Sequence, residues 1–261
     1  MDKQWDDKIK RLFSLEGKVA VVTGGAGSLG AGVARGLANF GAKVVITGRT
    51  ASSLAESAEQ VKQAGDVLAV VADVTDEASV ERLADQAIDA FGRADILVNV
   101  AGIAIRHPAE AFDIADFRKV IDSNVTGTFI PCKVFGARFK QQGGGKIVNT
   151  SSVRAFAGHP GGYAAYGTSK GAINLLTRQL ATEWAKYRIN VNAVAPTIFW
   201  TPLTQEVLED EKLKKIFLDR IPLGRAAVVE DMVGTTVYLC SAAADFITGQ
   251  VVYVDGGCTA G

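Results

Sequence analysis

Tyr166 and Lys170, four residues apart, are the residues in this sequence with the clearest chemical use. They open a stretch of helical length after the apolar run Lys146–Asn149, and an i, i+4 spacing puts both side chains on one helix face. A tyrosine hydroxyl has an unperturbed pKa of about 10, too high for a base at neutral pH. A nearby ammonium stabilises the phenolate and lowers that pKa. We therefore interpret the pair as a proton donor and acceptor.

The same segment contains a GxSxG pattern at residues 167–171, which in hydrolases carries a nucleophilic serine. That serine must directly follow a strand, and residues 164–166 do not form one. A catalytic histidine should also follow it, whereas His107 and His159 both precede it. The sequence therefore argues against a serine hydrolase.

Gly25, Gly27 and Gly30 form a GxGxxG pattern between the apolar run Val19–Val22 and a segment of helical length. Backbone amides in such a turn, together with the N-terminus of the helix, bind a pyrophosphate without charged side chains. We therefore predict a dinucleotide site. A tight turn without a ligand is the alternative.

Arg49 follows the second apolar run, about 20 residues after Gly30, where a carboxylate would bind the ribose 2′-hydroxyl of NAD. Residues 48–50 contain neither Asp nor Glu, and an arginine suits a 2′-phosphate. The prediction is that NADP(H) is preferred and that NAD(H) is the alternative cofactor. A solvated surface role is the other interpretation of Arg49.

Short apolar runs alternate with segments of helical length, a pattern typical of βαβ units and a parallel sheet. The expected strands are Val19–Val22, Val44–Thr47, Val67–Val71, Ile96–Val98, Lys146–Asn149, Ile189–Val194 and Val251–Val254. The expected helices are about 29–40, 51–64, 77–91, 113–140, 163–186, 203–218 and 230–242. With right-handed crossovers, this predicts an α/β fold: a single doubly wound Rossmann domain with strand order 3-2-1-4-5-6-7.

The domain is expected to span residues 18–261, after an N-terminal arm at 1–17. The arm's apolar residues have helical spacing, so we expect it to pack against the body. They are Trp5, Ile9, Leu12 and Phe13. A charged, amphipathic insertion at about 197–225 is either a lid over the strand ends or a plain surface helix.

Lys plus Arg and Asp plus Glu each number 28, so the chain has no global charge for binding nucleic acid or an anionic membrane. Three scattered cysteines, with neither histidine near them, argue against a zinc site and suit a reducing compartment. The charged N-terminus is unlike a secretory signal, and no apolar run is long enough to span a membrane. We expect no metal and a cytoplasmic location.

Eight stretches together resemble the short-chain dehydrogenase/reductase family, over roughly residues 15–258. They are TGGAGSLG at 23–30, DVTD at 73–76, NVAG at 99–102, SNV around Asn124, VNTSS at 148–152, YGTSK at 166–170, VNAVAPTIFWTP at 191–202 and ITGQVVYVDGG at 247–257. Within the family the chain looks most like the gluconate 5-dehydrogenase-like group of sugar-acid and polyol oxidoreductases, through the stretches VAPTIFWTPLT and SSVR.

The resemblance implies catalytic roles for four residues. Tyr166 would be the acid/base, and Lys170 would lower its pKa and bind the nicotinamide ribose. Ser152 would hydrogen-bond the substrate oxygen, with Ser151 as the second choice, and Asn124 would hold a water in a proton relay.

Cofactor contacts are implied at several strand ends. Besides Arg49, Tyr166 and Lys170, the implied residues are Gly24, Gly25, Gly27, Ser28, Leu29, Gly30, Asp73, Val74, Asn99, Ala101, Gly102, Pro196, Ile198 and Thr201. Four further residues follow strand ends, where ligands of open α/β sheets bind, and are substrate candidates. They are Arg106, Arg154, His159 and Trp200.

The leading hypothesis is an NADP(H)-dependent oxidoreductase that interconverts a secondary alcohol and a ketone on a small polar molecule such as a polyol or sugar acid. A catalytically idle nucleotide sensor on the same scaffold is the alternative, although it would not need all four catalytic residues. A sugar-nucleotide epimerase would normally need a further C-terminal substrate region. The resemblance also implies a homotetramer, with the strand at Val251–Val254 and the helix at 230–242 facing a partner.

Overall fold

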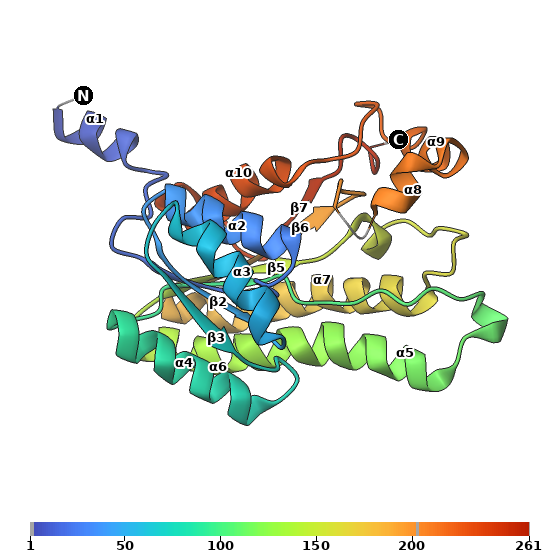
Figure 1. Ribbon diagram of the computed structural model, residues 1–261. Coiled ribbons are helices and arrows are strands. Elements are labelled where there is room, and N and C mark those ends of the chain that lie inside the picture. Colours follow the sequence, from blue (N-terminus) through green and yellow to red (C-terminus); the bar gives the residue numbers. More distant parts are fainter. Residues whose placement is uncertain (1–2, 202–203, 261) are drawn as a thin grey trace.

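A seven-stranded parallel sheet forms the centre of the protein (Figure 1). The computed structural model describes residues 3–201 and 204–260. Its strand order, β3-β2-β1-β4-β5-β6-β7, confirms the order expected from the sequence. The strands are β1 (Val19–Thr23), β2 (Lys43–Gly48), β3 (Val67–Val71), β4 (Ile96–Asn99), β5 (Gly145–Thr150), β6 (Ile189–Pro196) and β7 (Val251–Val254).

Helices cover both faces of this sheet (Figure 1). One face carries α2 (Ser28–Asn39), α3 (Ala51–Lys62) and α10 (Val229–Cys240). The other carries α4 (Glu77–Phe91), α5 (Ile114–Ile121), α6 (Gly127–Gln142) and α7 (Ala164–Trp184). Each face has its own apolar core, centred for example on Leu37 and Ile46 on the first and on Leu83 and Phe135 on the second. Burial on both sides explains why the central strands read as continuous apolar runs.

Parallel pairing brings the carboxyl ends of the strands to one edge of the sheet. Thr23 at the end of β1 lies opposite Thr47 of β2 and Asn99 of β4, and Asn99 lies opposite Asn149 of β5. Polar residues from strands far apart in the sequence therefore meet at this edge, where open α/β sheets bind ligands.

Two expected helices are interrupted. The stretch 113–140 contains α5, a π-helical turn at Asp122–Thr126, and α6. The expected helix at 203–218 is two short helices, α8 (Gln205–Glu209) and α9 (Glu211–Leu218), and its expected first residue lies outside the described residues. Apolar periodicity in the sequence did not reveal either break. Short 3₁₀ turns lie at Ala109–Ala111, Val153–Ala155, Ala185–Tyr187 and Ala242–Ala244.

The expectation that the N-terminal arm packs along the body is wrong for its helix. α1 (Lys3–Lys10) points away from the domain (Figure 1), and Trp5 and Ile9 are 44% and 42% exposed. Beyond the helix, the ring of Phe13 lies 6.2 Å from that of Tyr238, and Leu15 is fully buried. Eight mostly charged and polar residues offer too little apolar surface to hold α1 down.

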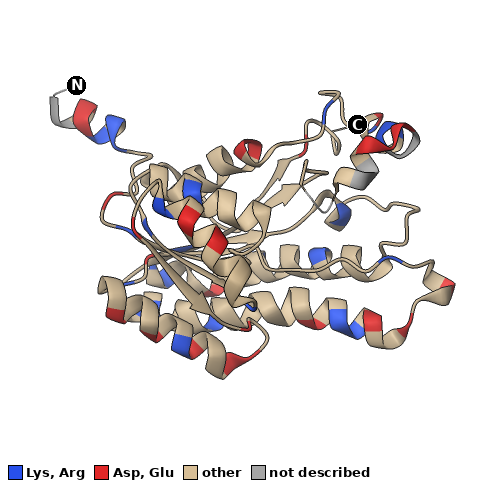
Figure 2. Ribbon diagram, viewed as in Figure 1, with Lys and Arg blue, Asp and Glu red and all other residues tan. Residues whose placement is uncertain are grey.

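Charged residues of both signs lie on the outer helices, while the strands are mostly free of charge (Figure 2). Within residues 3–201 and 204–260, no helix is both long enough and apolar enough to cross a bilayer.

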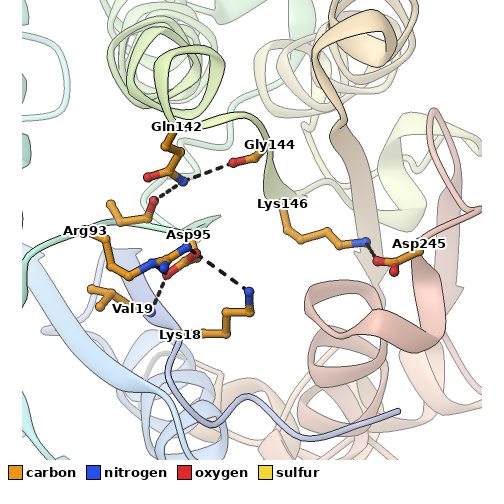
Figure 3. A network of polar contacts seen from close by, with 9 residues as sticks. Lys18, Val19, Arg93, Asp95, Gln142, Gly144, Lys146 and Asp245 are labelled. Atoms are coloured by element: carbon orange, nitrogen blue, oxygen red, sulfur yellow. Dashed lines mark hydrogen bonds and ion pairs between the residues drawn. The ribbon is translucent and has the colours of Figure 1, made fainter. Parts of the chain in front are cut away.

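A buried carboxylate at the opposite edge of the sheet ties two strands together (Figure 3). Asp95, directly before β4, is 6% exposed and accepts a hydrogen bond of 3.0 Å from the backbone N–H of Val19. Arg93 donates to the same carboxylate with two nitrogens, and the Lys18 ammonium is 3.8 Å away.

We expect Asp95→Ala to lower the free energy of unfolding by about 1–3 kcal/mol, because it leaves the buried Val19 N–H without a partner. Lys18→Ala, which removes an exposed and more distant charge, should cost less than about 1 kcal/mol. Urea unfolding of both variants checks this. Equal losses in the two variants would contradict the role given to Asp95.

Candidate active site

The Thr23 hydroxyl organises the loop that follows β4. It accepts hydrogen bonds from the backbone N–H groups of Val100 (3.2 Å) and Ala101 (3.3 Å) and donates to the Asn99 amide oxygen at 3.4 Å. The Asn99 amide nitrogen donates to Asn149 at 3.0 Å. The side chain of Asn99 is therefore engaged within the protein, where it accepts from the Thr23 hydroxyl that binds the Ala101 N–H.

The glycine turn after β1 leaves no room for side chains at three of its positions. A Cβ at Gly30 would lie 2.2 Å from the Gly24 carbonyl oxygen, and one at Gly25 would lie 2.6 Å from the Ile46 side chain. Gly24 has φ of +69°, and a Cβ there would meet the backbone of Ala101. Gly27 is different, since the nearest atom to its Cβ would be 3.5 Å away.

The same turn leads into the N-terminus of α2. Gly27 is the N-cap, and no side chain caps the first helical turn, which begins with Ser28, Leu29 and Gly30. Uncapped amides at a helix N-terminus, behind a turn too tight for side chains, form a cradle that fits a pyrophosphate.

Lys170 is a buried cation at the centre of the site. It is 3% exposed, its ammonium donates to the Thr150 carbonyl oxygen at 2.7 Å, and burial lowers its pKa to about 8. An ammonium has three N–H donors, so this contact leaves two for another group. Gly102 borders the ammonium, because a Cβ there would lie 3.7 Å from Nζ. These features fit the hydroxyl groups of a bound ribose.

Contrary to the expectation from the sequence, Lys170 is not among the groups that shift the pKa of Tyr166. Burial raises the pKa of Tyr166, and the groups that counter this are the Ser152 hydroxyl, through a hydrogen bond, and the Arg154 charge. The reason is geometric: the Lys170 ammonium lies over the tyrosine ring, 5.6 Å from its centroid, and is hydrogen-bonded to a carbonyl.

Ser151 and Ser152 have different surroundings. The Ser151 hydroxyl donates to the Asn174 amide oxygen at 2.5 Å, and this serine is fully buried. The Ser152 hydroxyl accepts a hydrogen bond from the backbone N–H of Arg154 at 3.2 Å. It also makes a hydrogen bond with Tyr166 that lowers the pKa of the tyrosine. Of the two serines, only Ser152 therefore has its hydroxyl beside Tyr166.

Asn124 lies in the π-helical turn and is fully buried. Its side chain accepts from the Ile103 N–H at 2.8 Å, donates to the Ile103 carbonyl at 2.9 Å and donates to the Ser169 hydroxyl at 2.9 Å. Both amide hydrogens are thus taken, so the side chain joins the loop after β4 to α7. π-turns frequently mark functional sites.

The remaining cofactor candidates lie around the same edge. One carboxylate oxygen of Asp73 accepts both the N–H (2.9 Å) and the hydroxyl (2.7 Å) of Thr75, which lowers the pKa of Asp73. Arg49 is exposed, and its charge also lowers that pKa. Val74 packs beside Gly127: a Cβ at Gly127 would lie 2.9 Å from a methyl carbon of Val74.

Hydrogen bonds hold the segment after β6 near the strand ends. The Ile198 carbonyl accepts from the Ala227 N–H at 3.0 Å, and the Thr201 hydroxyl lies 3.1 Å from that of Thr204. Pro196 ends β6 and is buried. Pro196, Ile198 and Thr201 therefore follow one another along the edge that carries the rest of the site.

A basic and aromatic cluster lies next to Tyr166. The Tyr163 ring is 6.0 Å from that of Tyr166 and 5.3 Å from that of His159, and the Tyr163 hydroxyl accepts from Arg106 at 3.3 Å. Arg154 is half-buried, and burial lowers its pKa. Burial and then the charge of Arg154 lower the pKa of His159. Three substrate candidates are thus brought together.

Trp200 is 48% exposed, and the ring contacts and hydrogen bonds that join the described residues of this cluster do not include it. Three residues that sequence reasoning missed do belong to the cluster: Tyr163, Phe217 and Arg220. The three-residue spacing of Tyr163 and Tyr166 was the available signal for the first. No local signal marks the other two. In the described part of the chain, no three His, Cys, Asp or Glu side chains lie together as metal ligands would.

Comparison with known proteins places this site in a family. The family model described as enoyl-(acyl carrier protein) reductase matches residues 24–259. A gluconate 5-dehydrogenase from Gluconobacter oxydans is 40% identical over 251 residues, covering 95% of this chain and 97% of that protein. A 2-dehydro-3-deoxy-D-gluconate 5-dehydrogenase from Escherichia coli is 41% identical, with coverage of 95% and 98%.

A solved structure is similar over the whole fold. A gluconate 5-dehydrogenase from Burkholderia cenocepacia, in complex with NADP and tartrate, matches with a TM-score of 0.91 at 35% identity, covering 96% of this chain and 98% of that one. The chain belongs to the short-chain dehydrogenase/reductase family, as the sequence motifs suggested, and it is an oxidoreductase acting on alcohol and ketone groups.

We expect Ser152→Ala to raise the pKa of Tyr166 further, because it removes a hydrogen bond that lowers this pKa. Phenolate absorbance, titrated against pH and corrected by subtracting the Tyr166→Phe protein, measures this pKa. Ser151→Ala is the matched control and should leave it unchanged. A fall in the pKa for Ser152→Ala, or equal shifts in both variants, would contradict the geometry described.

Proposed function

We propose that this protein is an NADP(H)-dependent dehydrogenase that interconverts a secondary alcohol and a ketone on a sugar acid. The observation that carries the proposal is the placement of Tyr166 between Ser152, Lys170 and the arginine cluster. Two relatives named as dehydrogenases of gluconate or 2-dehydro-3-deoxy-D-gluconate support the substrate class.

Tyr166 exchanges a proton with the substrate oxygen in this proposal, accepting it during alcohol oxidation and donating it during ketone reduction. The Ser152 hydroxyl holds the same oxygen and lowers the pKa of Tyr166. Bound nicotinamide supplies the hydride chemistry. Lys170 orients the nicotinamide ribose through its two remaining N–H donors. The buried Asn124 side chain holds the loop after β4 through its hydrogen bond with Ile103.

The glycine cradle and the N-terminus of α2 hold the pyrophosphate, and Arg49 holds the ribose 2′-phosphate. No carboxylate occupies residues 48–50 to repel that phosphate. A Cβ at Gly48 would lie 3.0 Å from Ala26, which limits side chains there. The NADP in the Burkholderia structure supports this choice of cofactor. The homotetramer stays a prediction, for which the edge strand β7 and α10 are the surfaces to test.

The idle nucleotide sensor is the competing function. A sensor needs the cradle but gains nothing from a tyrosine hydroxyl hydrogen-bonded to a serine beside a buried ammonium. Turnover of any sugar acid would exclude it.

We expect the protein to reduce NADP⁺ when D-gluconate or a related sugar acid is supplied, and we expect Tyr166→Phe to lower turnover by about 10²–10⁴-fold. Nicotinamide absorbance follows the reaction, and fluorescence titration should show that the variant still binds NADPH. Residual turnover above about a tenth of the wild-type rate would reject Tyr166 as the acid/base. Absence of turnover with every sugar acid tried would reject the substrate class.

We expect Arg49→Ala to reduce the preference for NADP⁺ over NAD⁺, measured as the ratio of kcat/KM values, by about 10-fold. That is the low end for a charge-assisted contact, because Arg49 is exposed. Lys62→Ala, which removes an exposed charge from α3, serves as the control and should not alter the ratio. A wild-type preference for NAD⁺, or an unchanged ratio in Arg49→Ala, would mean that Arg49 is only a surface residue.

A further inference from the structure

Tyr163 is fixed beside the reactive tyrosine by its place in α7. It is the N-cap of this helix, and its carbonyl accepts a hydrogen bond from the Gly167 N–H at 2.7 Å. The centroid of its ring lies 6.0 Å from that of Tyr166. The position of Tyr163 is therefore tied to that of the tyrosine that exchanges the proton.

Two neighbouring segments hold the Tyr163 ring in place. Gly162 has φ of +75°, and a Cβ there would lie 2.7 Å from the His107 carbonyl oxygen, so a glycine is needed for the two loops to meet. Next to His107, Arg106 lies over the Tyr163 ring, with its guanidinium carbon 5.7 Å from the ring centroid. His159 packs edge-on against the same ring at 5.3 Å. The ring is thus held by contacts with both segments.

The Tyr163 hydroxyl can still donate a hydrogen bond. A phenol group both accepts and donates, and the Tyr163 oxygen accepts from the Arg106 guanidinium at 3.3 Å. Among residues 3–201 and 204–260, the hydroxyl hydrogen has no acceptor. A hydroxyl that accepts a hydrogen bond is polarised by it and becomes a stronger donor. The Tyr163 hydroxyl is therefore available to donate to a ligand.

Tyr163 lines a cavity of about 550 Å³ that begins beside the reactive tyrosine, because Gly167 lines it as well. The lining also includes one carboxylate, of Glu110, and one guanidinium, of Arg154. The described residues contain no ion pair of either group. Since the two charges are opposite, the cavity fits the uncharged hydroxyl chain of a sugar acid better than its carboxylate. Each hydroxyl of such a chain both donates and accepts, as this lining requires.

We propose that Tyr163 is a specificity-determining residue whose hydroxyl donates a hydrogen bond to a substrate hydroxyl other than the one that is oxidised. Arg106 is then a positioning residue, because it binds the Tyr163 oxygen and covers the ring, rather than a direct ligand of the substrate. This inference rests on the proposed function, since the hydroxyl chain is that of the sugar acid. It gives a role to Tyr163, which neither the motifs nor the relatives' names assign.

The test removes one hydrogen-bonding group at a time from the protein and from the ligand. D-gluconate and its monodeoxy derivatives, each lacking a single hydroxyl, are titrated by calorimetry into the protein–NADPH complex, in which reduced cofactor and alcohol cannot react. We expect Tyr163→Phe to weaken gluconate binding by about 5-fold, the typical effect of one neutral hydrogen bond. One derivative, which lacks the hydroxyl that Tyr163 contacts, should bind the wild type and Tyr163→Phe equally.

Tyr187→Phe is the matched control. Tyr187 follows the other end of α7, and its ring also lies under a cation, with the Lys140 ammonium 4.5 Å from the centroid. This variant should leave the affinity for gluconate unchanged. Equal weakening of gluconate and every derivative by Tyr163→Phe would show that Tyr163 acts only through packing. An unchanged gluconate affinity would remove its hydroxyl from the site. Either result overturns the inference, as does failure of the wild type to bind gluconate.

A double-mutant cycle tests the role given to Arg106. Arg106→Met keeps most of the aliphatic stem and removes the guanidinium. We expect it to weaken gluconate binding in the wild-type background by about 2- to 5-fold and to have no further effect in Tyr163→Phe, because it acts through that hydroxyl. Losses that add, or no loss in either background, would overturn the positioning role.

Turnover separates this inference from the proposed function. Sugar-acid oxidation by the wild type, combined with unchanged gluconate binding in Tyr163→Phe, would overturn the inference alone. Gluconate binding that depends on the Tyr163 hydroxyl, without turnover, would overturn the proposed function alone.

Discussion

Burial of the Lys170 ammonium is the constraint on which the rest of the site depends. A charge removed from water costs several kcal/mol unless it is well partnered. In the part of the chain that the structure describes, the Lys170 ammonium has one hydrogen-bond acceptor, the Thr150 carbonyl at 2.7 Å. That acceptor is the last residue of β5, and Lys170 itself lies in the first turns of α7. The ammonium therefore fixes the start of α7 against the strand ends, and Tyr166 one turn earlier is placed with it.

The hydrogen bonds that surround this cation connect several separate elements of the fold. The π-turn at Asn124 ties the loop after β4 to Ser169, next to the lysine, and Thr23 at the end of β1 holds the same loop from the other side. The glycine turn can lie close to that loop because Gly24 has no Cβ. A Cβ at this position would collide with Ala101. The parallel register of the strands therefore brings these separate local features together at one edge of the sheet. The buried Asp95 network holds the opposite edge without contributing to chemistry.

The sheet order and the pairing of Tyr166 with Lys170 could be predicted from the sequence, because apolar runs, helical segments and an i, i+4 spacing are local patterns. The exposed α1, the π-turn and the break between α8 and α9 could not, because apolar periodicity does not show whether a face is covered or a helix is interrupted. Arg220 was missed for another reason: only the fold brings its charge near enough to lower the pKa of Arg154 and that of His159. The pKa of Tyr166 was misjudged because spacing alone does not show which atom the ammonium faces.

A crystal structure of this chain with bound NADPH is the most direct test of the account. It should place the pyrophosphate at the amides of Ser28, Leu29 and Gly30, with the Lys170 ammonium hydrogen-bonded to the nicotinamide ribose and the nicotinamide ring beside Tyr166. The account would be contradicted by a cofactor bound in the groove between α2, α3 and α10. It would also be contradicted by a nicotinamide ribose out of reach of Lys170.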